Sequence, residues 1–187
     1  MPKPLKITTP VIMLSIMLFS IGGSILNWYI FNGTKREIFF NIAIVLGATA
    51  IHFFIMFLSA PIVFTIFRKR FNYSSAWFNQ KSFEKSMYRV LRVKDWKSKV
   101  PAYDSREYSL KDHLPEEIIM NMCHAEVVHE VICVLSYIPI LLGRVIGDYK
   151  ILILTSMIFS CCHLPFIFIQ RFNRPRIISV KNRIFHT

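Results

Sequence analysis

The amino-acid sequence predicts an all-α membrane protein with about four transmembrane helices and a basic, aromatic-rich cytoplasmic segment between the second and third helices. The chain has 187 residues, of which 53% are hydrophobic and only 18% are charged, against about a quarter in an ordinary soluble domain. Its apolar residues form long blocks without a charge, and its mean hydropathy is +0.43. This profile excludes a disordered chain, a coiled coil and a small disulfide-rich domain. We expect residues 1–187 to form a single polytopic membrane domain.

The first two helices are expected at residues 10–31 and 38–67. The first stretch is uncharged over 22 residues, and a helix needs ~20 apolar residues to cross a bilayer. Trp28 and Tyr29 close it as interfacial anchors, and no small-residue cleavage site follows, so we interpret it as a retained helix and not as a signal peptide. The second stretch is uncharged over 30 residues and is expected to tilt or to bend near Pro61.

The last two helices are expected at residues 118–142 and 151–170. Before the third helix, Pro115 and the following acidic residues form a helix-start pattern. The fourth is an uncharged run of 20 residues that contains His163 and Pro165. Between the two pairs of helices, the segment 68–117 holds 12 basic and 7 acidic residues with aromatic residues among them. The portion from Phe83 to Trp96 fits either a basic amphipathic helix on the membrane surface or a partly ordered connector.

The distribution of charge predicts the orientation of the chain. The net charge is +12, and the two ends and the central segment hold 19 of the 23 basic residues. The positive-inside rule therefore places both termini and the central segment in the cytoplasm. No nucleic-acid-binding module accompanies the basic residues, so we expect them to face anionic lipid and not nucleic acid. The four cysteines show no Cys-x-x-Cys spacing and predict no disulfide framework.

The candidate catalytic residues lie in the third helix. Glu126 and His129 are three residues apart and so share one helix face, while His124 lies about 140° away around the axis. A carboxylate can fix the tautomer of an imidazole, and the imidazole can then remove a proton from a hydroxyl group. The alternative is an interfacial helix whose polar side is simply wet. Di-metal carboxylate bundles need a second Glu-x-x-His pair, which the chain lacks, so no metal is expected.

A second cluster of polar residues runs from Gln170 to Arg176, at the cytoplasmic end of the last helix. The arginine guanidinium recognises phosphate through two parallel hydrogen bonds, so three arginines here are able to hold a phosphorylated donor such as an acyl thioester carrier. The alternative is an anchor that meets lipid phosphates.

These motifs resemble one known family. The motifs are Val93-Lys94-Asp95-Trp96-Lys97, Ala125-Glu126 with His129, a proline in the last helix, and Gln170-Arg171-Phe172-Asn173-Arg174-Pro175-Arg176. Together they resemble the glycosyl-4,4′-diaponeurosporenoate acyltransferases, small bacterial membrane proteins of staphyloxanthin-type carotenoid biosynthesis. The resemblance covers about Phe71 to Ile177. The chain has His124 and Glu130 where the family form has Arg before Ala-Glu and Trp after the His.

The resemblance implies transfer of a fatty acyl group to a sugar hydroxyl of a membrane glycolipid, a glycosylated carotenoid in the family. It implies no bound cofactor, and an acyl-CoA or acyl-carrier protein as co-substrate. Glu126 and His129 would be catalytic, and the implied substrate-binding residues are Trp96, Lys97, Gln170, Arg171, Asn173, Arg174 and Arg176. The alternative is a non-catalytic polytopic membrane protein, such as a transporter or an accessory subunit. The charged residues gather at one interface, which favours chemistry on a lipid.

Cysteine labelling tests the predicted topology. A cysteine at Lys81 or Lys181 should react with a membrane-impermeant reagent only from the cytoplasmic side, and a cysteine at Asp148 only from the outside, because one crossing separates position 148 from each of the other two. Labelling of position 148 from the cytoplasm would contradict the four-helix topology.

Overall fold

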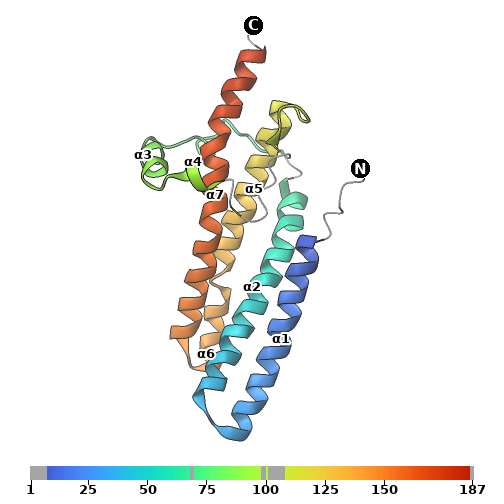
Figure 1. Ribbon diagram of the computed structural model, residues 1–187, viewed down its shortest axis with the longest axis vertical. Coiled ribbons are helices and arrows are strands. Elements are labelled where there is room, and N and C mark those ends of the chain that lie inside the picture. Colours follow the sequence, from blue (N-terminus) through green and yellow to red (C-terminus); the bar gives the residue numbers. More distant parts are fainter. Residues whose placement is uncertain (1–7, 68–69, 98–99, 101–107, 186–187) are drawn as a thin grey trace. The chain divides into compact units, whose positions relative to one another are not determined.

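The computed structural model describes residues 8–67, 70–97, 100 and 108–185 (Figure 1). Lys3, Lys6 and parts of the predicted cytoplasmic segment lie outside these residues. All regular secondary structure in the described part is helical, and four stretches are long and apolar enough to cross a membrane: Pro10–Thr34, Glu37–Phe67, Pro115–Ile146 and Tyr149–Ile184. This confirms the predicted fold class and a multi-pass membrane protein.

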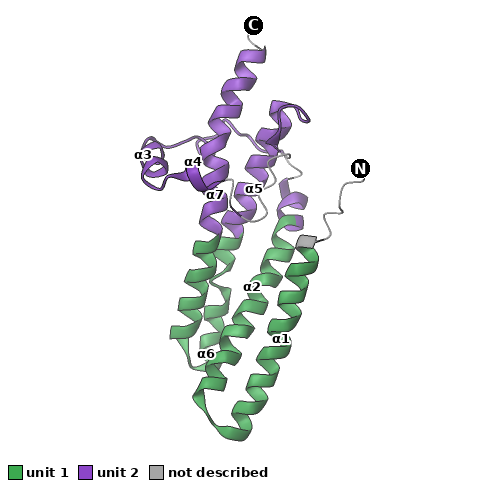
Figure 2. Cartoon of the chain, viewed as in Figure 1, with its two compact units in different colours: residues 1–60, 132–162 green, residues 61–131, 163–187 purple. Residues whose placement is uncertain are grey.

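The chain divides into two compact units, coloured separately in Figure 2. The first comprises residues up to 60 together with 132–162, and the second comprises residues 61–131 together with those from 163 onwards. Helices α2, α5 and α7 contribute residues to both units.

The first unit contains a close pair of antiparallel helices, α1 (Thr8–Thr34) and the first part of α2 (Glu37–Phe67). The hydroxyl of Ser24 donates to the carbonyl oxygen of Ala43 at 2.8 Å. A methyl group added at Gly23 would lie 2.8 Å from Leu46 Cδ1, so the Leu46 side chain would have to shift to admit it. Small residues that allow close backbone approach are the usual means of helix association in a membrane, where apolar side chains gain little from leaving lipid.

The third predicted helix, 118–142, lies within one candidate membrane span, Pro115–Ile146, but its α-helix ends at Leu135. Helix α5 spans Pro115–Leu135, a 3₁₀ helix follows at Ile138–Leu142, and the short α6 spans Gly143–Ile146. Pro139 favours the break, because proline has no N–H for the helical hydrogen bond to Leu135 and its ring crowds that carbonyl, although Pro61, Pro165 and Pro175 lie inside continuous helices. The apolar pattern continues across this break, so hydropathy alone did not reveal it.

The fourth predicted helix, 151–170, ends too early. Helix α7 spans Tyr149–Phe185, so the whole Gln170–Arg176 motif is helical, including Pro175. The prediction ended at the first charged residue, which marks where the chain leaves the hydrocarbon and not where its helix stops. Arginine and lysine are good helix formers and let the helix continue into the polar region.

The second unit holds α3 (Ser82–Val90) and α4 (Val93–Trp96), which lie beside α7 in Figure 1, together with the later part of α7 and the first part of α5. Both short helices belong to the segment that the sequence places between the second and third membrane helices. All the predicted site residues lie in this second unit.

Candidate functional site

The centre of the second unit is the buried carboxylate of Glu126 on α5, which binds two arginines of α7. Arg171 Nη1 donates to Glu126 Oε1 at 2.6 Å, and Arg174 Nη1 binds the other oxygen, Oε2. The side chain of Glu126 is 0% exposed and that of Arg174 is 1% exposed. Arg171 and Arg174 are three residues apart, so both project toward the same neighbour from one face of α7.

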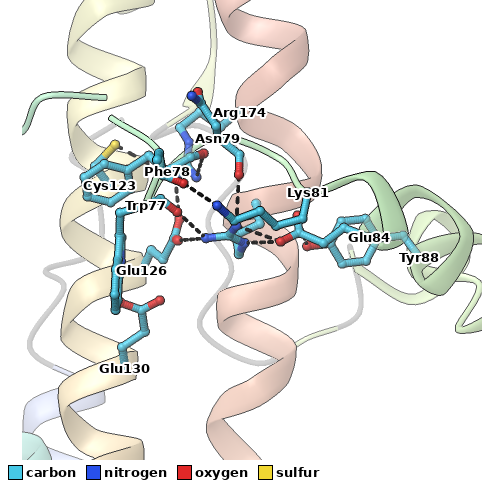
Figure 3. Close-up of polar contacts among 12 residues, drawn as sticks. Trp77, Phe78, Asn79, Lys81, Glu84, Tyr88, Cys123, Glu126, Glu130 and Arg174 are labelled. Atoms are coloured by element: carbon cyan, nitrogen blue, oxygen red, sulfur yellow. Dashed lines mark hydrogen bonds and ion pairs between the residues drawn. The ribbon is translucent and has the colours of Figure 1, made fainter. Parts of the chain in front are cut away.

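A second carboxylate, that of Glu84 on α3, completes this arrangement (Figure 3). Arg171 donates to Glu84 Oε1 through Nη2 at 2.6 Å and through Nε at 3.0 Å. Tyr88, one turn along α3, donates its hydroxyl to Glu84 Oε2 at 3.1 Å. Burial and the adjacent Glu84 carboxylate raise the pKa of Tyr88, which keeps the phenol protonated as a donor. We call Glu84, Glu126, Arg171 and Arg174 the arginine–glutamate network.

The network also binds the chain just before α3. Arg171 donates to the carbonyl oxygens of Trp77 and Asn79 at 3.0 and 3.2 Å, and Arg174 donates to that of Phe78. The Arg174 guanidinium lies 5.0 Å from the centre of the Phe78 ring, a cation–π distance. Two arginines thus hold a non-helical segment by its backbone.

The four side chains of the network balance in charge, with two arginines and two carboxylates. Buried ions are costly unless they are paired and hydrogen-bonded, and removing one partner leaves the other charge uncompensated. The network is therefore a strong constraint on how α3, α5 and α7 pack within this unit.

The partners of His129 differ from those of Glu126. Its Nδ1 lies 2.9 Å from Nδ1 of His163 on α7, and its ring stacks on Phe166 at 4.5 Å between centres and an interplanar angle of 9°. Among the described residues, no hydrogen bond joins Glu126 to His129. That Glu126 orients His129 stays a prediction. We call His129 and His163 the imidazole pair.

An Nδ1-to-Nδ1 hydrogen bond requires one ring to carry the proton on Nδ1 and the other to present a lone pair there. When His129 is the donor, its Nε2 holds a lone pair and is able to accept a proton. His163 is buried, while His129 is half-buried, and within the described part of the chain His129 Nε2 makes no hydrogen bond. With His129 as the donor, the pair presents His129 Nε2 as an acceptor, with a neutral imidazole on the other side of the ring.

Three of the predicted substrate-binding residues form a cationic cluster around Phe172. Lys97 Nζ donates to Asn173 Oδ1 at 2.7 Å and lies 5.2 Å from the centre of the Phe172 ring. The guanidinium of Arg176, an exposed residue, lies 4.5 Å from the same ring. Burial, and then the positive charges of Arg176 and Lys94, lower the pKa of Lys97. We call Lys97, Asn173 and Arg176 the cationic cluster.

The remaining predicted residues have local partners. Trp96 donates its indole N–H to the carbonyl of Leu91 at 2.8 Å, and buried Gln170 donates to the hydroxyl of Tyr108 at 3.1 Å. Glu130, where the family form has Trp, accepts a hydrogen bond from the Trp77 indole at 3.1 Å. Within the described ranges, no three His, Cys, Asp or Glu side chains are grouped to hold a metal ion.

The structure adds two residues that the sequence analysis did not select. Glu84 had no signal of its own, because its partner Arg171 is 87 residues away. His163 was visible as a histidine in an apolar helix, but its separation from His129 by 34 residues and by the break after α5 hid the pairing.

Comparison with known proteins identifies a family over the part of the chain that contains these residues. The profile of the family described as glycosyl-4,4′-diaponeurosporenoate acyltransferase matches residues 74–183, more than half of the chain. No curated protein and no solved structure matches the chain. The matched region begins before α3 and contains the arginine–glutamate network, the imidazole pair and the cationic cluster.

Replacing Glu126 with Gln tests the network. The change keeps the shape and removes the charge between two arginines, so we expect a loss of about 3–5 kcal/mol in the free energy of unfolding, as for other broken buried ion pairs. Thermal unfolding of the purified protein in detergent measures it. Glu117→Gln is the matched control on the same helix, because that side chain is 58% exposed and should cost at most ~1 kcal/mol. Equal unfolding temperatures for the two variants would contradict the constraint.

Proposed function

Since the chain belongs to the glycosyl-4,4′-diaponeurosporenoate acyltransferase family, we propose that it transfers a fatty acyl group from an acyl thioester to a sugar hydroxyl of a membrane glycolipid. The proposed acceptor is the glycosylated carotenoid of the family description. The observation that carries the proposal is the family match over residues 74–183, which includes every residue to which a role is assigned below.

We assign the general base to His129. In the proposed reaction the proton of the sugar hydroxyl moves to His129 Nε2 as the hydroxyl oxygen bonds to the thioester carbonyl carbon. The carbon–sulfur bond then breaks, and the proton passes from His129 to the departing sulfur. The products are an ester and a free thiol, so no other reactant is consumed.

His163 is proposed as the positioning residue for this base. Its Nδ1 accepts the Nδ1 hydrogen of His129, which selects the tautomer with a free Nε2 and stabilises the imidazolium as it forms. The stacked Phe166 ring further restricts the plane of the His129 imidazole. Glu126 remains in the site as the residue that places Arg171 and Arg174.

The cationic cluster is proposed to bind the donor. Coenzyme A and the phosphopantetheine arm of a carrier protein both carry phosphate, and Lys97 and exposed Arg176 supply positive charge for it. Asn173 lies ten residues beyond His163 on α7, which corresponds to about 15 Å along a helix. An extended thioester arm suits such a separation of phosphate and reacting carbonyl. Both carriers are cytoplasmic, so this assignment requires the cytoplasmic location that we propose for the C-terminal part of α7 and for both termini.

The first test of the function is His129→Ala, assayed as acyl transfer by the purified protein in nanodiscs. A general base contributes ~10² to 10⁴ in rate, so turnover should fall by about that factor. His124→Ala, on another face of α5, should have a much smaller effect. Full activity in folded His129→Ala would exclude this mechanism, whereas no acyl transfer by the wild type would favour the accessory-protein alternative.

The same acyl-transfer assay tests the positioning role of His163. Asparagine has an acceptor oxygen at the same number of bonds from the backbone as histidine Nδ1, so His163→Asn should retain most of the turnover while His163→Leu loses roughly 10- to 100-fold in kcat. Glu126→Gln tests the untested link to His129: in protein that is still folded, a change acting through His129 should have little further effect in the His129→Ala background. Equal loss in the Asn and Leu variants would remove the positioning role of His163.

The donor site is tested by Lys97→Met and Arg176→Met. Each change removes a charged hydrogen-bond donor, worth about 1.5–3 kcal/mol, and should raise the KM for the donor by roughly 10- to 100-fold with a smaller effect on kcat. Because the pKa of Lys97 is lowered, the wild type should lose donor affinity at a lower pH than Lys97→Arg as pH rises. Lys111→Met, at an exposed lysine in the turn before α5, is the control and should leave KM unchanged.

A further inference from the structure

Helix α3 faces the protein with its acidic residue and faces outward with its apolar ones. Glu84 and Tyr88 are its buried residues: Glu84 belongs to the arginine–glutamate network, and Tyr88 donates a hydrogen bond to Glu84. Phe83 is 63% exposed and Val90 is 80% exposed, although such residues normally supply the buried face of an amphipathic helix. Phe83, Met87 and Val90 follow the spacing i, i+4, i+7 and therefore form one apolar stripe.

Two basic residues lie on another face of α3, about 150° around the helix axis from this stripe. Lys85 and Arg89 are one turn apart on α3, and Lys81 and Arg92 stand at its two ends, all four exposed. The only acidic residue within α3 is Glu84, which is already neutralised by Arg171. The exposed surface of α3 is thus apolar and positively charged, which is the composition of helices that lie in the surface of an anionic membrane.

The depth at which α3 is attached agrees with this composition. Arg171, which binds Glu84, is the first charged residue after the uncharged run that ends at Gln170 of α7. The ion pair therefore holds α3 at the level where α7 passes from hydrocarbon to headgroups. Trp77, 63% exposed beside this attachment, is a residue type typical of that level.

From these observations we propose that α3 docks on the headgroup region of an anionic phospholipid bilayer, with the Phe83–Met87–Val90 stripe inserted among the acyl chains and the basic residues on lipid phosphates. The arginine–glutamate network then connects the lipid surface to the helices that carry the imidazole pair and the cationic cluster. The proposal concerns lipid binding alone and holds whether or not the chain is an acyltransferase.

Photo-crosslinking tests the docking. A photoreactive benzoylphenylalanine replaces Val90, the full chain is placed in nanodiscs of phosphatidylglycerol or phosphatidylcholine, and the intact protein is weighed after irradiation. We expect adducts with the mass of phosphatidylglycerol, and about tenfold fewer adducts in phosphatidylcholine. The same probe at Leu154, 59% exposed on α7 within its uncharged run, is the control and should crosslink to both lipids equally.

Charge reversal in the same protein identifies the attraction. Lys85→Glu with Arg89→Glu should lower the phosphatidylglycerol adduct at position 90 by tenfold or more, since each basic residue near an anionic surface changes binding about fivefold. Arg70→Glu with Lys111→Glu changes the net charge equally at exposed residues outside α3 and should leave the adduct unchanged. Unchanged thermal unfolding shows that the network is intact in each variant.

Three results would overturn the proposal: no lipid adduct at position 90, equal adducts with both lipids, or an adduct with a second protein chain in place of lipid. The last result would identify α3 as a protein-docking surface. Because the readout is a mass and not turnover, a failure here is distinct from a failure of the proposed acyl transfer.

Discussion

The second unit depends on one interaction, the buried carboxylate of Glu126 between two arginines of α7. Its two oxygens each take one guanidinium, so α5 and α7 meet at a fixed height and rotation. The same guanidiniums then hold the backbone of residues 77–79 and the carboxylate of Glu84 on α3. Segments far apart in the sequence are thereby joined through a single charged centre. In a membrane protein, where apolar packing against lipid is nearly as favourable as packing against protein, such a centre supplies the specificity that hydrophobicity does not.

Much of the fold was predictable from the sequence, and the errors have physical causes. Four apolar stretches predicted four long helices, because the length of an uncharged run is set by the thickness of the bilayer. Helix ends are set by backbone hydrogen bonding, which hydropathy does not measure. The break near Pro139 and the continuation of α7 to Phe185 were therefore missed.

The candidate site was predictable as a set of residues but not as a set of pairs. Helical spacing suggested that Glu126 and His129 belong together because they share a face of α5. In the structure each has a closer partner on α7, Arg174 for the carboxylate and His163 for the imidazole. Spacing along one helix shows which residues face the same way, and the facing helix decides which of them interact. The spacing of residues along α5 does not show how α7 is rotated about its own axis.

The motif from Gln170 to Arg176 shows how one short stretch of helix serves two clusters. Arg171 and Arg174, at the spacing i, i+3, project into the protein and bind Glu126. Phe172 and Arg176, at the spacing i, i+4, lie on another side of α7, where Lys97 and Arg176 both contact the Phe172 ring. The three arginines of the motif therefore differ in their surroundings and are not equivalent as binding groups for a donor phosphate. Arg174 is 1% exposed and already bound to protein groups, so we propose a positioning role for it and not direct donor binding. Arg176 is exposed beside Lys97 and is the arginine of the three that is able to meet an incoming anion directly. Substitution of Arg174 should therefore change stability first, and substitution of Arg176 should change donor affinity first.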